Sequence, residues 1–262
     1  MIGVLALLVI GGGGAAGVAW WRWDTARQPA VADAVAVMNR AVADAVAAAG
    51  PDAAVALSDV LRSTTCRINL FRDGGVFTAN ADLYTDLGGE DSLINAMAQR
   101  LSASYAVRRG PAVSGVSPLL ATVPGGVELS VRKVSEGWLS VSARTGCSLG
   151  SVPAPSSASP TDAGAAGITA LFADLGTRAT AFSRRRLDCS GGAIVTVAAV
   201  SAPVDSSSLG RRLAGVLPAG ARQFTSGTSN RVAYRDGSTS VVVAATDDGT
   251  AITGQYTTSC GP

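Results

Sequence analysis

The four cysteines, at positions 66, 147, 189 and 260, restrict the fold of this 262-residue chain more than any other feature. They are widely spaced, form no CxxC motif and occur in a chain without histidine, which does not fit the common zinc sites. An even number of well-separated cysteines is typical of disulfide bonds, and disulfides persist outside the cytosol. The sequence therefore predicts a body that folds in an oxidising, extracytoplasmic compartment.

Two segments approach a cysteine in the same way. WLSVSARTGC, residues 138–147, and AITGQYTTSC, residues 251–260, are strand-like runs that follow a short polar turn containing glycine. Leu139 and Ile252 each stand eight residues before the final cysteine, and the residues after them alternate in the same phase. Because a shift of one residue turns every side chain of a strand to the opposite face, the shared phase favours an internal duplication over two unrelated hairpins.

The first predicted copy begins with a long helical region over 31–63, in which Gly50-Pro51 makes a break or kink. After Cys66, two extended runs surround a turn signal at 72–75. A helix over 90–105 and a hairpin that ends at the second cysteine complete the copy. No strand is predicted with clarity between the helix and the hairpin.

The second predicted copy repeats this order in a shorter form. The expected elements are a helix over 168–188, Cys189, a strand over 193–200, a short helix over 205–217, and strands over 230–237, 238–246 and 250–260.

The predicted fold class is α+β, with two tandem disulfide-closed modules of two layers each, following an N-terminal transmembrane or signal helix. Helices cover one face of each sheet, and the opposite face offers Ser, Thr and Arg to solvent or to a partner. The Ser- and Pro-rich stretch between the copies is typical of a linker. The expected division is a transmembrane or signal segment at 1–21, a helical stalk and lead-in helix at 22–65, the first module at 66–147, the linker at 148–164 and the second module at 165–262.

Four cysteines allow three disulfide pairings. If the first and last strands of each copy are antiparallel neighbours, the start of one strand lies beside the end of the other. We therefore expect the pairs Cys66–Cys147 and Cys189–Cys260, each of which closes a loop that stabilises the fold by roughly 4 kcal/mol in the chain-entropy account. Disulfides that cross between the copies, and a redox-active pair, are the alternatives.

The N-terminal residues 1–21 carry no charged side chain. A run of this length can cross a bilayer, and the tryptophans close to its end are typical of the membrane interface. The small residues before Trp20 also fit a signal-peptide cleavage site. Arg22 and Arg27 follow the run, and the positive-inside rule alone would leave the body in the cytoplasm. The cysteines favour the opposite orientation.

The absence of histidine removes Ser-His-Asp triads, Cys-His pairs and histidine metal ligation. A Ser–Lys dyad would have to use Lys133, the only lysine, which lies at a predicted strand end without an SxxK motif. The carboxylate pair Asp247-Asp248 is first a turn signal, and Glu90-Asp91 is typical of a helix start. We therefore predict a protein that is not an enzyme and needs no cofactor or metal, with a histidine-free envelope hydrolase as an alternative.

Four residues are candidate contacts for a partner. Arg184, Arg185 and Arg186 form the densest basic cluster, which with the arginines at 211–212 could contact an anionic lipid or polymer. The competing interpretation is a solvated helix end. Trp138 opens a strand beside a turn, as a binding anchor or as edge packing. The net charge of +2 gives no reason to expect nucleic-acid binding.

Together these features predict a non-enzymatic membrane protein with a single span at 1–21 and an extracytoplasmic body. Its duplicated modules would bind or scaffold a protein component of the cell envelope or of a secretion system. The helix expected near 30–62 would act as a spacer or a dimer contact. A secreted ligand-binding protein is the alternative.

Overall fold

The structure of the chain, a computed structural model, describes residues 30–69, 72–113, 115–152, 154, 156–224 and 230–260. The N-terminal segment 1–21, for which the sequence predicts a membrane or signal helix, lies outside the described residues. Within the described part of the chain, no helix combines the length and apolar character needed to span a membrane.

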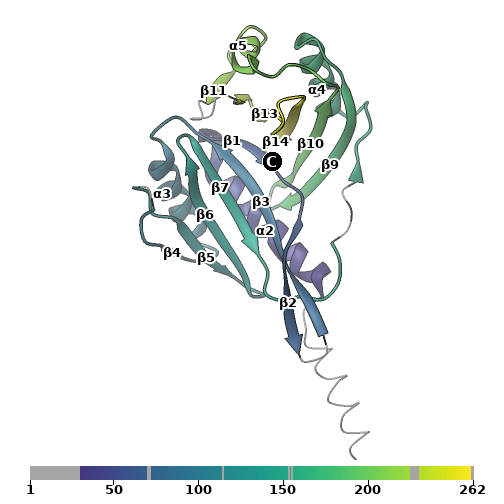
Figure 1. Cartoon of the computed structure of the whole chain (residues 1–262). Helices are drawn as coiled ribbons and strands as arrows, with labels where there is room; N and C mark the ends of the chain where they lie inside the picture. The colour runs from purple at the N-terminus through teal and green to yellow at the C-terminus, as the bar shows by residue number, and fades with distance from the viewer. Residues whose placement is uncertain are drawn as a thin grey trace, which may run out of the picture.

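The fold is α+β and contains two antiparallel sheets, as Figure 1 shows. The first half of the chain forms one sheet, with strand order β1-β3-β7-β6-β5-β4 and with β2 also pairing with β3. Its elements are α2 (Val31–Ala49), η1 (Gly50–Asp52), β1 (Ala54–Leu57), β2 (Leu61–Asn69), β3 (Arg72–Tyr84), α3 (Glu90–Leu101), β4 (Ala106–Arg109), β5 (Leu119–Val123), β6 (Val127–Ser135) and β7 (Trp138–Arg144).

The second half of the chain forms the other sheet, with strand order β11-β12-β13-β14-β10-β9-β8. Its elements are β8 (Ser156–Ser157), α4 (Ala163–Asp174), β9 (Ala179–Cys189), β10 (Gly192–Ser201), α5 (Leu209–Ala214), β11 (Arg222–Phe224), β12 (Arg231–Asp236), β13 (Thr239–Ala245) and β14 (Ile252–Thr258).

The two sheets follow the same order of pairing. In the first, β4, β5, β6 and β7 lie in chain order, followed by β3 and then β2. In the second, β11, β12, β13 and β14 lie in chain order, followed by β10 and then β9. In each half a helix precedes the hairpin β2–β3 or β9–β10, and a second helix follows it.

The first helix is shorter than expected and is not a spacer. Helix α2 ends at Ala49, where Gly50 takes a φ of 65° and Pro51 follows, and β1 and β2 replace the helix expected up to residue 63. The short run 54–57 is apolar at every position, and such a run has no period that separates helix from strand. Helix α2 lies in the core, in contact with β3, β6 and β7 of the first sheet and with β9 of the second.

The helix expected over 168–188 is also wrong in extent. Helix α4 ends at Asp174, Gly176 follows with a φ of 69°, and β9 begins at Ala179. Alanine and arginine favour helices locally, but the ladder that β9 forms with β10 overrides this preference. The residues at 72–75, expected as a turn, form the beginning of β3, and β4 and β5 occupy the stretch where no strand was predicted.

The second sheet is buried on both faces. On one face α4 contacts β9, β10 and β14, and α5 contacts β12. On the other, Leu187 and Ile194 join the core around α2, while Ala233 and Val242 pack against β1. In the described part of the chain, helices cover only one face of the first sheet. Its outer face packs against the second half around Tyr84 and Trp138 and is open over the rest of β7, β6 and β5.

Candidate functional site

Both expected disulfides are present, but each one links two strands that have a third strand between them. The Cα atoms are 5.9 Å apart in Cys66–Cys147 and 6.3 Å apart in Cys189–Cys260. The first and last strands are not neighbours as expected, because β3 lies between β2 and β7 and β10 lies between β9 and β14. Since two strand spacings amount to about 10 Å, the chain that follows the last strand must leave the sheet plane to reach its partner.

Gly74 provides the space for the first disulfide. It pairs with Cys66 across the β2–β3 ladder, and Ser148 exchanges two backbone hydrogen bonds of 2.9 Å with Gly75 on the other side of β3. A Cβ atom on Gly74 would lie 2.9 Å from Cys147 Sγ and 2.7 Å from Ile68 Cδ1, which is too close for either contact. In the second half Gly192 similarly pairs with Cys189.

The three consecutive arginines lie on strand β9, not at a helix end. Arg184 Nη1 lies 3.6 Å from Asp162, and Arg186 Nε lies 3.0 Å from Asp188. Arg185 donates a 3.1 Å hydrogen bond from Nη2 to Asn39 of α2. The cluster therefore has acidic and amide partners within the chain.

Arg185 fastens the second sheet to the central helix of the first half. Burial lowers its pKa to about 10, although the charge of Asp59 acts in the opposite direction. The arginines, α2 and the linker line a cavity of about 230 Å³. Among the described residues, Arg185 Nη1 has no hydrogen-bond partner. The other basic pair lies on α5, where Arg212 donates to the backbone oxygens of Leu175 and Asp205.

Trp138 lies where the two halves meet. Its ring stacks on Tyr84 with centroids 6.1 Å apart, and the Arg231 guanidinium lies 4.4 Å from its centroid. Its indole Nε1 donates a 3.0 Å hydrogen bond to Asp82. Burial raises the pKa of Asp82, while the bond from Trp138 and the charge of Arg231 partly oppose the shift. The tryptophan is thus held by groups from both halves.

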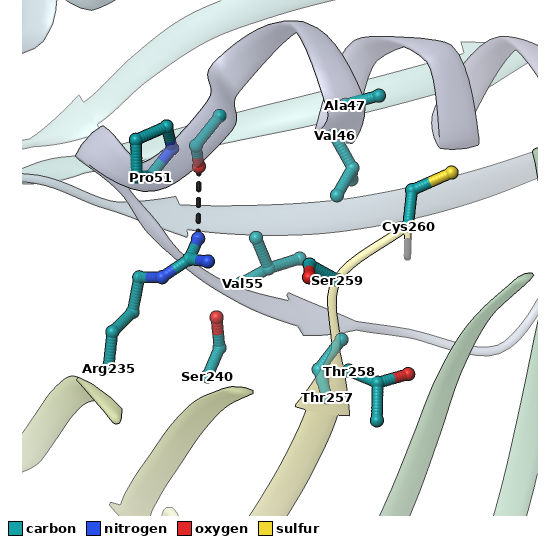
Figure 2. Close-up of a pocket in the computed structure, with 11 residues that line it drawn as sticks. Val46, Ala47, Pro51, Val55, Arg235, Ser240, Thr257, Thr258, Ser259 and Cys260 are labelled. Atoms are coloured by element: carbon teal, nitrogen blue, oxygen red, sulfur yellow. Dashed lines mark hydrogen bonds between the residues drawn. The ribbon is translucent and has the colours of Figure 1, made fainter. Parts of the chain in front are cut away.

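A cavity of about 230 Å³ lies between α2, β1 and the second sheet, and Figure 2 shows its lining. Arg235 Nη1 donates to the backbone oxygens of Gly50 at 2.9 Å and Ala53 at 3.0 Å. Burial lowers the pKa of Arg235, while the charge of Asp52 raises it and that of Arg222 lowers it further. Because this guanidinium caps the end of α2, the cavity lies at the contact between the two halves of the chain. We call this contact the joint.

Besides Arg185, three further arginines of the second half, at 222, 231 and 235, contact the first half. Arg222 Nη2 lies 2.7 Å from Asp86 Oδ2, and its Nη1 lies 3.6 Å from Asp52 Oδ1. None of these three residues was predicted from the sequence as a contact. The only signal was the alternation on β12, where 231, 233 and 235 point away from the helix-covered face that Val232 and Tyr234 occupy.

The candidate acidic and basic catalytic groups have structural partners. Lys133 Nζ lies 3.5 Å from the buried Glu90 carboxylate, which also accepts a hydrogen bond from the Gly137 amide. Burial alone would raise the pKa of Glu90, but the backbone hydrogen bonds and the Lys133 charge outweigh it and lower the pKa. Asp248 accepts hydrogen bonds from Thr246 and Thr250 within its turn, which lower its pKa to about 2.

The open outer face of the first sheet is the remaining candidate site. Alternate residues of β7 are partly exposed on it, and Asn80, Ser142 and Ser130 follow one another across β3, β7 and β6. Arg144 and Arg132 lie on the same face, next to Glu128 and Ser140. The expected surface of Ser, Thr and Arg is therefore found on this sheet, and β1 and α2 cover the equivalent face of the second sheet.

No family model and no curated protein matches the sequence. Among solved structures, the complex of MucA and MucB from Pseudomonas aeruginosa shows 12% identity, with 82% of this chain and 90% of that chain covered and a TM-score of 0.14. A similarity this weak supports no statement about the fold or the function of this chain.

Proposed function

We propose that the chain is an extracytoplasmic, membrane-tethered binding or scaffolding protein, and that it presents the outer face of its first sheet to a component of the cell envelope. One observation carries the proposal: the equivalent face of the second sheet is buried against the first half, whereas this face is open beyond its contact with the second half at Tyr84 and Trp138. The joint between the halves supplies a rigid support, because core residues and the arginines at 185, 222, 231 and 235 cross it.

We infer that the two halves are copies of one ancestral module. The same strand order supports this inference, as does the disulfide that closes each copy. The position of glycine is a third argument, because Gly74 and Gly192 each pair with the first cysteine of their copy. In this interpretation the first copy begins with α2 and not at residue 66, since α2 takes the place that α4 has in the second copy.

The two disulfides support an oxidising compartment, and the apolar segment 1–21 supports a tether. The test is to isolate the full-length chain from its native membrane and to modify its thiols with a maleimide reagent before and after reduction. We expect modification only after reduction. Four thiols that react without reduction would contradict the assignment. Amino-terminal sequencing of the same sample separates a tethered chain from a secreted one, which would begin near Trp20.

The binding role is tested with a photo-crosslinking amino acid. We place it at Ser142, on the open face, and at Thr180, an exposed position of β9, as a matched control. Crosslinking in intact cells should join Ser142, but not Thr180, to an envelope protein. Equal crosslinking from both positions, or none from Ser142, would contradict the proposed binding face.

A further inference from the structure

A cavity of about 480 Å³ lies on the outer face of the first sheet, compared with about 230 Å³ for the cavity of Figure 2. The segment that leads into β5 forms one wall, with Val113, Val116 and Pro118. Strands β5 and β6 supply the remaining lining, with Leu120 and the four residues Ser130, Arg132, Lys133 and Val134. We call this cavity the outer groove.

The outer groove gathers apolar side chains that are exposed to solvent. Val113 is 67% exposed and Val134 is 45% exposed, and they are two of the five large hydrophobic residues that are exposed in the described part of the chain. Leu120 of β5 lines the same hollow and is partly exposed. Exposed apolar groups that line one hollow are typical of a surface that is covered by a partner.

The outer groove also has a cation that is free to bind. Arg132 is exposed and has no ion pair among the described residues. The neighbouring Lys133 pairs with Glu90 on the helix-covered side. Arg108 pairs with Leu120 across the β4–β5 ladder, so its side chain adds positive charge at the other edge of the same face.

Hydrogen-bonding groups continue from the outer groove across the sheet. Ser130 lies opposite Ser142, which in turn lies opposite Asn80. Hydroxyl and amide side chains can both donate to and accept from the main chain of an extended segment. A ligand of this face therefore needs an apolar part, an anionic group and amide-like hydrogen-bonding groups.

We propose that the outer groove binds an extended peptide segment of a partner protein, in which an apolar side chain fills the hollow and an adjacent Asp or Glu pairs with Arg132. The proposal rests on the binding function proposed above and names the chemistry of the partner. A membrane surface fits the geometry less well, because the cations are few and the groove is bordered by polar side chains that would hydrogen-bond to a peptide.

The test uses the full-length chain, purified in detergent, as the target for a displayed library of random peptides about ten residues long. Selected peptides should be enriched in Asp or Glu next to Val, Leu or Ile. Fluorescence anisotropy then measures their binding to the wild type, to R132Q and to R144Q. Arg144 lies on the same face but does not line the outer groove, which makes R144Q a matched control.

We expect R132Q to weaken peptide binding by about tenfold or more, because a charge-assisted hydrogen bond is lost, and R144Q to change it less than about twofold. V134D should also weaken binding, because it removes an apolar side chain from the groove and adds a negative charge that repels the carboxylate of the peptide. Selected peptides without a carboxylate, or equal affinities for the wild type and R132Q, would overturn the proposal. So would a wild-type dimer in sedimentation that R132Q dissociates, because the occupant would then be a second copy.

The crosslinking experiment at Ser142 separates this inference from the proposed function. If R132Q still crosslinks to the same envelope protein with unchanged yield, the peptide groove is wrong and the binding face stands. If no envelope protein is crosslinked while acidic peptides bind through Arg132, the groove stands and the proposed partner class is wrong.

Discussion

The two halves of the molecule share a strand order but differ in what covers their outer faces. In the first half, β6 and β7 alternate between buried and exposed residues, so one face of the sheet lies on helices and the other on solvent. In the second half, five consecutive residues of β13 are buried, because α4 and α5 cover one face and the first half covers the other. The same strand order thus leaves much of one sheet face open in the first half and buries the equivalent face in the second.

The difference teaches how the halves depend on each other. Helix α2 has 19 residues and contacts both sheets, whereas α4 has 12 and α5 has six. The second sheet therefore obtains part of its core from the first half. A sheet that is buried on both faces needs that partner. We therefore expect the second half to lose more stability than the first when contacts at the joint are removed.

The largest expected effect comes from removing the disulfides one at a time. Replacing Cys66 and Cys147 with serine, or Cys189 and Cys260 with serine, should lower the free energy of unfolding by roughly 4 kcal/mol. Cys189 is buried in the core around α2, so the second pair should cost more. Chemical denaturation of both double variants measures the difference. A larger loss of unfolding free energy on removing the first disulfide would contradict the idea that the second half depends on the first.

A substitution at the joint should act on both halves. Leu187 belongs to β9 but is 1% exposed within the core of the first half, so L187A should cost about 3 kcal/mol and shift the unfolding of the whole chain. Leu213 of α5 is fully buried within the second half alone and provides the control. Calorimetry should show one transition for L187A, and amide hydrogen exchange should show faster exchange confined to the second half for L213A. Two separate transitions in the wild type would contradict the shared core.

An open face was predicted for both sheets, which is wrong for the second, although the contrast between β6 and β13 has a signal in the sequence. VELSVRKVS alternates, which is typical of a sheet with one open face, while VVVAA is a continuous apolar run, which is typical of a strand buried on both faces. The disulfide pairing was also predictable, from the similar approach of two segments to their final cysteines, and so were the helix α3 and the C-terminal hairpins. These predictions depend on local periodicity and spacing.

Other features depend on tertiary contacts and could not be predicted in this way. The helices predicted for the residues that form β1, β2 and β9 were wrong. These residues have mixed local preferences, and their pairing with β3 and β10 decides their structure. The joint arginines Arg222, Arg231 and Arg235 are separate in the sequence and gather only when β11 and β12 pair. The outer groove combines β5, β6 and the segment before β5, where no strand was predicted.

A smaller effect tests the glycine that makes room for the first disulfide. G74A places a Cβ 2.9 Å from Cys147 Sγ and 2.9 Å from the Ser148 oxygen, and should cost about 2 kcal/mol. Gly146 has no atom within 4 Å of an added Cβ, so G146A should change the stability by less than about 0.5 kcal/mol. Thermal unfolding under oxidising and reducing conditions measures both. Equal stability of the two variants would show that the chain is not tightly packed where it passes β3 to bring Cys147 to Cys66.

The smallest expected effect separates two carboxyls of the first half by their response to pH. The pKa of Glu90 is lowered in the folded state, so its contribution is present above its unfolded pKa and is lost as the pH falls through the folded value. E90Q should therefore cost about 1 kcal/mol at neutral pH, because Lys133 loses its partner, and nothing at acidic pH.

The pKa of Asp82, at the joint, is raised mainly by burial, so its ionised form opposes folding as the pH rises between the unfolded and folded values. D82N should accordingly equal or exceed the wild type in stability at neutral pH and match it in acid, with an amide oxygen still able to accept from Trp138. Denaturation curves of both variants across this pH range check the opposite signs, and parallel curves for the two would show that the joint treats Asp82 no differently from the interior of the first half.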